Sequence, residues 1–191
     1  LRIVAACAAG LDYAHQQKVI HRDVKPENVM YDPATGTVHL IDFGLAAEIR
    51  ESLSRYSQGF VAQAGTERYM SPEQWLGQLQ NAGCDQWALG VMAWELLTGA
   101  APYHGSGMTL GFAVCQAPVP ALPSHLSVLQ PVFARVLQKK ACDRYETCTQ
   151  FVDELTGLLQ PRAIPVSPPA AGPSTSRSPP AATCWRGVTS G

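Results

Sequence analysis

The chain lacks the features that would place it across a membrane or mark it for export. It contains no run of about 18 uncharged apolar residues, which a membrane-spanning helix needs. The nearest candidate, residues 91–101, is short and carries Glu95. No signal peptide is present, and the first residue is Leu1 rather than Met. We therefore expect a fragment of a longer gene product, with no membrane segment of its own.

Charge of either sign is sparse. Charged residues make up 15% of the 191 residues and the formal net charge is −1, which gives no electrostatic reason to expect a nucleic acid or a membrane surface as partner. Residues 1–160 carry 11 basic and 15 acidic side chains, whereas residues 161–191 carry three arginines and no acid. Apolar residues make up 46% of the chain, as in globular proteins, and the length suggests one domain.

The cysteines follow no pattern associated with metal ions. None belongs to a Cys-x-x-Cys pair, and none has a histidine at the spacing of a zinc site. We expect reduced, mostly buried thiols in a cytoplasmic protein, because disulfides rarely persist in that compartment. The six residues are Cys7, Cys84, Cys115, Cys142, Cys148 and Cys184.

Hydrophobic periodicity predicts a mostly helical domain with one β-hairpin. Residues 29–31 and 38–41 are short β-type runs joined by Asp32-Pro33-Ala34-Thr35-Gly36, a turn sequence. Apolar side chains at 3-4 spacing mark the expected helices. These cover residues 1–18, 85–97, 110–115, 126–139 and 148–159, with Gly99 as the expected stop of the second.

Two segments lack such periodicity. Residues 45–65 fill with Ser, Gln and Gly and predict a long loop. Residues 161–191 contain seven prolines and five serines, a composition that buries too little apolar surface to fold. We therefore expect a domain over residues 1–160, followed by a flexible tail or linker.

The segment from His21 to Asn28 carries the strongest functional signal. It is His21-Arg22-Asp23-Val24-Lys25-Pro26-Glu27-Asn28 and matches the catalytic-loop pattern H-R-D-x-x-x-x-N. Farther along, Asp42-Phe43-Gly44 matches the magnesium-binding pattern D-F-G. The predicted hairpin between the two motifs delivers Asn28 at one end and Asp42 at the other, so both can reach one metal–phosphate cluster.

These residue types suit phosphoryl transfer, which depends on positioning and charge neutralisation. Asp23 would accept the proton of the incoming hydroxyl, and Lys25 would place a positive charge beside the phosphoryl group. Asn28 and Asp42 would hold Mg²⁺ against the nucleotide phosphates, because this hard cation prefers oxygen ligands. The alternative is a turn that happens to contain charged residues.

Over residues 1–160 the chain resembles the eukaryotic-type (Hanks-type) Ser/Thr protein kinases, and particularly their bacterial members. Gly65-Thr66 and Ser71-Pro72-Glu73 resemble the end of the activation segment, with Ser71 where the family usually has Ala. Residues 85–90 resemble the start of the central helix, and Asp143-Arg144-Tyr145 resembles the late arginine motif. The resemblance implies an α+β fold, the mostly helical C-terminal lobe of a kinase, with a short hairpin carrying the two motifs.

The same resemblance implies roles for further residues, with ATP and Mg²⁺ as cofactors. Thr66 would contact Asp23 and Lys25 and favour Ser/Thr over Tyr specificity. The catalytic set is Asp23, Lys25, Asn28 and Thr66, and the metal ligands are Asn28 and Asp42. The nucleotide-binding set is Lys25, Glu27, Asn28, Met30, Ile41 and Asp42. The structural and regulatory set is His21, Arg22, Phe43, Gly44, Glu73, Asp85 and Arg144, in which Arg144 would pair with Glu73. Plain core packing is the alternative for Met30, Ile41 and Phe43.

Arg22, directly before Asp23, is the family's mark of control by phosphorylation of the activation segment, because a phosphate pairs well with arginine. The candidate acceptors are Ser52, Ser54 and Ser57. A solvated serine loop is the alternative.

Nothing in the chain matches the Gly-rich loop or the strand lysine that clamp the nucleotide phosphates. Residues 105–111 are glycine-rich, but their spacing and their place after the central helix do not fit such a loop. We expect this chain to need a missing N-terminal lobe, and to bind ATP poorly without it.

Three functions are weighed. The favoured one is the catalytic lobe of a kinase that transfers the ATP γ-phosphate to Ser or Thr of a protein substrate, within a parent protein that family resemblance links to membrane anchoring. The second is a non-catalytic kinase-like scaffold or interaction module, although such relatives usually lose Asp23, Asn28 or Asp42. The third is a small-molecule phosphotransferase, against which Lys25 and Ser71-Pro72-Glu73 speak.

Overall fold

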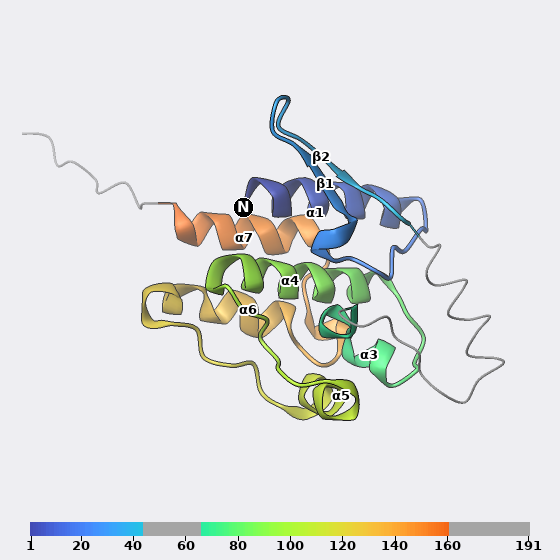
Figure 1. Cartoon of the computed structure of the whole chain (residues 1–191), viewed down its shortest axis with the longest axis vertical. Helices are drawn as coiled ribbons and strands as arrows, with labels where there is room; N and C mark the ends of the chain where they lie inside the picture. Colours follow the sequence, from blue (N-terminus) through green and yellow to red (C-terminus); the bar gives the residue numbers. More distant parts are fainter. Residues whose placement is uncertain (44–65, 161–191) are drawn as a thin grey trace, which may run out of the picture. The chain divides into compact units, whose positions relative to one another are not determined.

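Three long helices pack side by side in the computed structural model, which describes residues 1–43 and 66–160 (Figure 1). They are α1 (Arg2–Gln16), α4 (Ala82–Thr98) and α7 (Cys148–Leu159). Helix α1 lies against both α4 and α7. The predicted mostly helical fold with one hairpin is confirmed for these residues. No helix among them is both long and apolar enough to cross a membrane.

Helix α4 is the centre of the fold. Its residues from Cys84 to Trp94 are all buried, as expected for a helix that is apolar on every side. The Asn81 side chain accepts a hydrogen bond from the backbone N–H of Gly83 and so caps the start of the helix. Gly99 ends it in the left-handed conformation, with φ of 80°. The predicted stop at Gly99 is therefore confirmed.

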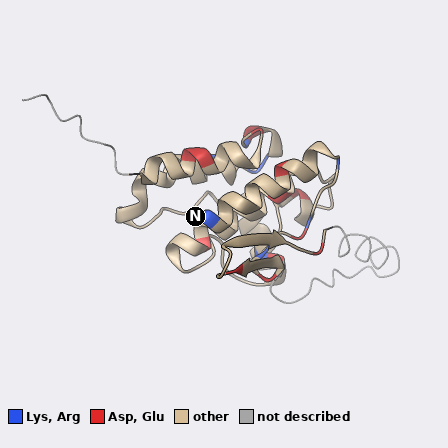
Figure 2. Cartoon of the chain, turned by 90° about the horizontal axis from the view of Figure 1, so that it is seen from above, with Lys and Arg blue, Asp and Glu red and all other residues tan. Residues whose placement is uncertain are grey.

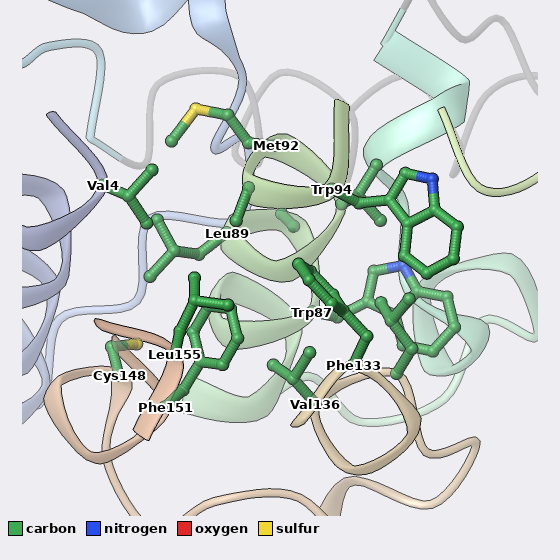
Figure 3. Close-up of a cluster of buried hydrophobic side chains, with 14 of the residues drawn as sticks. Val4, Trp87, Leu89, Met92, Trp94, Phe133, Val136, Cys148, Phe151 and Leu155 are labelled. Carbon is green, nitrogen blue, oxygen red and sulfur yellow. The ribbon is translucent and has the colours of Figure 1, made fainter. Parts of the chain in front are cut away.

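Aromatic side chains join α4 to the helices that follow it (Figure 3). The ring of Phe133, on α6 (Gln130–Val136), meets Trp94 edge-on at 5.2 Å between centroids and Phe151 of α7 at 6.1 Å. Edge-to-face pairs of this kind stabilise by roughly 1 kcal/mol beyond the area they bury. Gly90 allows the close approach of α6, because a Cβ there would lie 2.9 Å from Val136.

The hairpin consists of β1 (Val29–Asp32) and β2 (Thr37–Leu40), paired antiparallel from Val29 opposite Leu40 to Asp32 opposite Thr37. At its turn the Asp32 carboxylate accepts hydrogen bonds from the Thr35 hydroxyl at 2.8 Å and the Ala34 N–H at 2.9 Å. These bonds lower the pKa of Asp32, the Thr35 hydroxyl having the largest effect. Strand β2 lies against α1, which ties the hairpin to the helical body.

The remaining elements are short. They are η1 (Pro26–Asn28), η2 (Thr66–Tyr69), α3 (Pro72–Trp75), α5 (Gly107–Gln116), η3 (Ser124–Leu129) and η4 (Ala141–Asp143). The helix predicted over residues 126–139 is wrong as a single element, because η3 precedes a shorter α6 that begins beside Pro131, a favoured residue at the start of a helix. Gly111, in the glycine-rich segment, packs on Trp75: a Cβ there would lie 2.7 Å from the indole ring. That glycine serves the contact between α3 and α5.

Candidate active site

The loop after α1 holds Asp23 in a defined orientation. Asp23 is 8% exposed, and its carboxylate Oδ2 lies 3.0 Å from the Lys25 ammonium. The Asn28 side-chain amide donates to the backbone carbonyl of Asp23 at 2.7 Å and to its Oδ2 at 3.2 Å. Asn28 belongs to η1, whose Pro26 supports the tight turn between Lys25 and the hairpin. Three residues of the H-R-D-x-x-x-x-N motif thus meet around one carboxylate.

Asp85, in the first turn of α4, holds this loop in place through hydrogen bonds. Its carboxylate is fully buried and accepts hydrogen bonds from the backbone N–H groups of His21 at 2.9 Å and Arg22 at 2.6 Å. His15 of α1 adds a third bond, with Nε2 at 2.8 Å. A buried carboxylate that accepts several hydrogen bonds positions its donors firmly. The central helix and α1 therefore determine where the catalytic loop lies.

Arg22 has a backbone conformation that costs energy. Its φ is 67°, a left-handed value uncommon for residues other than glycine. The Arg22 N–H is held by Asp85, and its carbonyl accepts a hydrogen bond from the Gln74 side chain at 2.9 Å. Gln74 belongs to α3, directly after the Ser71-Pro72-Glu73 motif. Strained residues held this way cluster at functional sites.

The D-F-G segment is tied to the same loop. The Ile41 N–H donates to the Asn28 carbonyl, and the Ile41 carbonyl accepts from His21 Nε2, each at 2.9 Å. The rings of His21 and Phe43 lie 4.4 Å apart between centroids. Asp42, between Ile41 and Phe43, has a φ of 63° and is exposed. Two separate motifs therefore meet, and the Asp42 carboxylate stays accessible to solvent.

Glu73 and Arg144 form a buried ion pair. The Arg144 guanidinium donates to both Glu73 carboxylate oxygens, at 2.8 and 2.9 Å, as the resemblance implied. It also donates to the backbone carbonyls of Gly83 at 2.8 Å and Gln138 at 2.9 Å, and lies over the Trp87 ring. Both charges of this pair are therefore neutralised and hydrogen-bonded within the protein, as buried charges require.

A pocket of about 570 Å³ opens between η2, the end of α4 and the start of α5. Glu95 accepts a hydrogen bond from the Tyr69 hydroxyl at 2.5 Å and pairs with Arg68 at 3.6 Å. Burial, and then the Glu95 carboxylate, raise the pKa of Tyr69. Glu67 accepts from the Gly107 N–H at 3.0 Å. The sequence did not predict this pocket, because its walls lie far apart along the chain.

The predicted site residues fall into three groups. Asp23, Lys25, Asn28 and the loop residues beside them come together, as described. Glu27 and Met30 are exposed near the motifs, Met30 at 58%. The backbone of Thr66 begins η2, but its side chain is not among the parts that the structure describes, and Gly44, Ser52, Ser54 and Ser57 lie outside the described residues.

Charged residues are scattered over the described part of the chain. Figure 2 shows them as separate blue and red segments of a mostly tan ribbon, consistent with the charged content of 15%.

This arrangement coincides with a known class of protein: a family model for the protein kinase domain matches residues 2–156. The chain therefore belongs to the protein kinase domain family. It is 34% identical over 180 residues to "Serine/threonine-protein kinase PknF" of Mycobacterium tuberculosis. The aligned region covers 88% of this chain and 37% of that protein. It is 36% identical over 160 residues to "Serine/threonine-protein kinase PknB" of Mycobacterium leprae, covering 81% and 25%.

Solved structures agree with this assignment. The chain is similar to the PknI kinase domain of Mycobacterium tuberculosis, with a TM-score of 0.60, 31% identity, and coverage of 82% of this chain and 53% of that one. A double mutant of the same domain gives a TM-score of 0.62 at 29% identity. The predicted membership among bacterial Hanks-type Ser/Thr protein kinases is confirmed. The chain spans 37% or less of the curated relatives that it matches here.

Proposed function

We propose that this chain is the catalytic lobe of a Ser/Thr protein kinase, which transfers the γ-phosphate of ATP to Ser or Thr hydroxyls of a protein substrate. The observation that carries the proposal is the Asp23 carboxylate, held by Lys25 at 3.0 Å and Asn28 at 3.2 Å in a loop fastened to Asp85. The buried, oriented carboxylate beside a cation suits a group that accepts a proton from a hydroxyl during phosphoryl transfer.

The side chains around Asp23 divide the remaining work. Asn28 donates its amide nitrogen to Asp23, which leaves its oxygen as a ligand, and Asp42 offers an exposed carboxylate. These oxygen donors fit Mg²⁺, which when bound to ATP would neutralise phosphate charge. Lys25 keeps a positive charge next to Asp23 where the phosphoryl group would pass. The polar contacts orient Asp23 before any substrate arrives.

A second lobe is part of the proposal. Met30, on β1 next to the motifs, leaves an apolar side chain 58% exposed. The resemblance places the adenine ring against Met30 and Ile41. This chain matches 53% of the length of the PknI kinase domain structure. We therefore expect a small lobe in the parent protein to cover the nucleotide, and negligible transfer by this chain alone.

The pocket bounded by Glu67, Arg68 and Glu95 supports a protein substrate. It adjoins η2, the turn that starts at Thr66, where the resemblance places the acceptor hydroxyl. A pocket of this size can take one or two side chains of an extended peptide.

We propose the cytoplasm as the compartment of this lobe, because the cytoplasm supplies ATP.

The proposal is tested on a protein in which the small lobe of the parent, or that of the PknF relative, precedes Leu1. Asp23→Asn is expected to lower the rate of phosphate transfer from ATP to a protein substrate by at least about 10²-fold, the contribution of a positioned base. Nucleotide affinity should change little, because Asp23 faces the hydroxyl. Asp153→Asn, an exposed acid on α7, is the matched control.

Three results would count against the proposal. Full activity in Asp23→Asn would remove the role of Asp23. Nucleotide binding without any transfer by the unmodified two-lobe protein would favour the non-catalytic scaffold. Transfer to a small molecule in preference to protein would favour the third function.

A further inference from the structure

Three side chains of metal-ligating type meet where α1 packs against α7. Asp12 and His15 lie three residues apart on α1 and so share one face, and Cys148 is the first residue of α7. A carboxylate oxygen, a ring nitrogen and the thiol sulfur all lie within 4.8 Å of one another. Among residues 1–43 and 66–160 this is the one such group with ligand atoms this close.

The donor types match one class of cation. Nitrogen from histidine, sulfur from cysteine and oxygen from a carboxylate together form a ligand set of Zn²⁺, at bond lengths of about 2.0–2.3 Å. Tetrahedral geometry at those lengths separates ligand atoms by about 3.5 Å. Closing Asp12, His15 and Cys148 around one ion therefore needs an inward shift of about 1 Å.

The surroundings of the cluster already orient its ligands. His15 Nε2 lies 2.8 Å from Asp85 Oδ2, a fully buried carboxylate. Metal-bound histidines generally donate their other ring N–H to a carboxylate in this way, and here that leaves Nδ1 with the lone pair. The Asp12 carboxylate accepts the N–H groups of Cys148 and Thr149 at 2.8 Å, one on each oxygen. Each oxygen keeps a second acceptor position.

The electrostatic environment also favours a cation. Two carboxylates border the cluster, because Asp12 belongs to it and the buried Asp85 carboxylate bonds to His15. The negative charge of these carboxylates attracts a divalent cation. On binding, the thiol proton leaves to solvent and a sulfur–metal bond forms, as metal–thiolate chemistry requires. His15 is 14% exposed, which gives the ion a route from solvent.

The geometry points to a binding site for one thiophilic divalent cation, of which Zn²⁺ is the type, formed by Asp12, His15 and Cys148. The ion would tie α1 to the first turn of α7. It would also stiffen His15 against Asp85, the residue that holds the His21 and Arg22 backbone. None of its three ligands belongs to the phosphate-handling set, so metal binding can be measured without the proposed kinase activity.

Cobalt is the probe, because Co²⁺ replaces Zn²⁺ in such sites and a cobalt–thiolate bond absorbs in the near ultraviolet. The 191-residue chain is kept reduced and is freed of metal by a chelator. We expect it to bind one Co²⁺ and to show a thiolate absorption band, which Zn²⁺ removes by displacing the Co²⁺. Cys148→Ser should lose the band. Cys142→Ser, which removes an exposed thiol outside the cluster, should keep it. A band that survives Cys148→Ser or disappears in Cys142→Ser overturns the proposal.

Thermal unfolding gives a second measurement. Zn²⁺ at about 100 times its Kd should raise the Tm of the chain by about 5–10 °C, because the ion binds only the folded state. If Cys148→Ser fails to fold, as judged by circular dichroism, Asp12→Asn replaces it. Asn keeps one acceptor oxygen for the α7 N–H groups but lacks the charge, and it should weaken Co²⁺ binding at least tenfold. Unchanged Co²⁺ affinity in Asp12→Asn, or no Tm rise with Zn²⁺ in the unmodified chain, also overturns the proposal.

Discussion

The candidate active site and the Glu73–Arg144 ion pair are both built from charged side chains, yet their environments are opposite. Arg144 is 4% exposed, and its guanidinium donates to the Glu73 carboxylate and to backbone carbonyls of three other residues. Asp42, at the active site, is exposed, and both it and Arg22 have left-handed backbones. The pair is satisfied by the protein itself, whereas Asp42 is positioned for something outside it.

The difference separates structural charge from functional charge. A buried pair whose hydrogen bonds are complete stabilises only as long as both partners are present. A strained backbone with an accessible carboxylate persists only because the surroundings hold it, and such strain is found at ligand sites. Changes at the two regions should therefore affect different quantities, the free energy of unfolding in one case and ligand binding in the other.

Breaking the ion pair should have the largest effect on stability. Arg144→Met leaves the Glu73 carboxylate buried without its cation, which we expect to lower the free energy of unfolding by about 3–5 kcal/mol. Urea denaturation followed by tryptophan fluorescence measures it. Lys140→Met, at an exposed neighbouring position, is the control. The double change Glu73→Leu with Arg144→Met should recover part of the loss, and a double variant worse than both singles would contradict this account.

Loosening the anchor of the catalytic loop should come second. Asp85→Asn replaces one acceptor oxygen with an NH₂ group that faces the N–H donors of His21 and Arg22. We expect a loss of about 2–3 kcal/mol, because a charged acceptor with several donors disappears. Hydrogen exchange should accelerate at the His21 and Arg22 amides before it does in α4. Equal acceleration throughout would show that Asp85 does not act on the loop in particular.

Lys139 should give a smaller, pH-dependent effect. Burial lowers its pKa to about 8, while its ammonium donates to the Tyr103 hydroxyl and the Val114 carbonyl. Between pH of about 8 and the ordinary lysine value of about 10.4, the unfolded chain binds more protons than the folded one, so stability rises with pH in that window. Because the side chain is only partly buried, we expect only about 1 kcal/mol.

Comparison with Lys139→Met isolates that contribution from the cysteines and tyrosines that titrate in the same range. The free energy of unfolding of the unmodified chain, relative to that of the variant, should increase between pH of about 8 and pH of about 10. A constant difference across the window would mean that Lys139 stays charged in the folded chain.

Asp42→Asn should change stability least. Its side chain is exposed, so we expect the free energy of unfolding to stay within about 0.5 kcal/mol. In the two-lobe protein the same change should weaken binding of the Mg²⁺–nucleotide complex at least tenfold, since a carboxylate ligand is lost. Isothermal titration with Mg²⁺ and a non-hydrolysable ATP analogue measures this. Unchanged affinity would remove Asp42 from the metal ligands.

Features set by neighbouring residues were predictable from the sequence. Helix α7 has the predicted bounds of 148–159, and α1 and the hairpin differ from prediction by one or two residues at most of their ends. The motifs around Asp23 and Asp42 were recognisable because phosphate chemistry restricts both residue type and spacing. The four-residue helix α3 was not predicted, since so short a helix shows no periodicity, and α5 begins at Gly107, earlier than its apolar residues indicate.

Features assembled from distant residues were not predictable. The hydrogen bond from Gln74 to the Arg22 carbonyl spans 52 positions, and Asp12 bonds to the Cys148 N–H across 136. No local pattern signals such contacts, because they depend on how α1, α3 and α7 pack. The cysteine spacings indicated no metal site, because spacing along the chain cannot reveal ligands that come together only when separate helices pack.

The complete burial of α4 has a consequence for how the chain is made. Residues Cys84 to Trp94 are buried in a core to which α1, synthesised earlier, and α6, synthesised later, contribute, and α6 in turn packs against α7. A nascent chain that has not yet released Phe151 and Leu155 from the ribosome leaves the Phe133 ring, which packs on Trp94 of α4, without its partner on α7. Such exposed apolar surface is prone to aggregate and is a target for chaperones. We expect ribosome-bound intermediates ending before Phe151 to be degraded far faster by added protease than those that extend beyond α7.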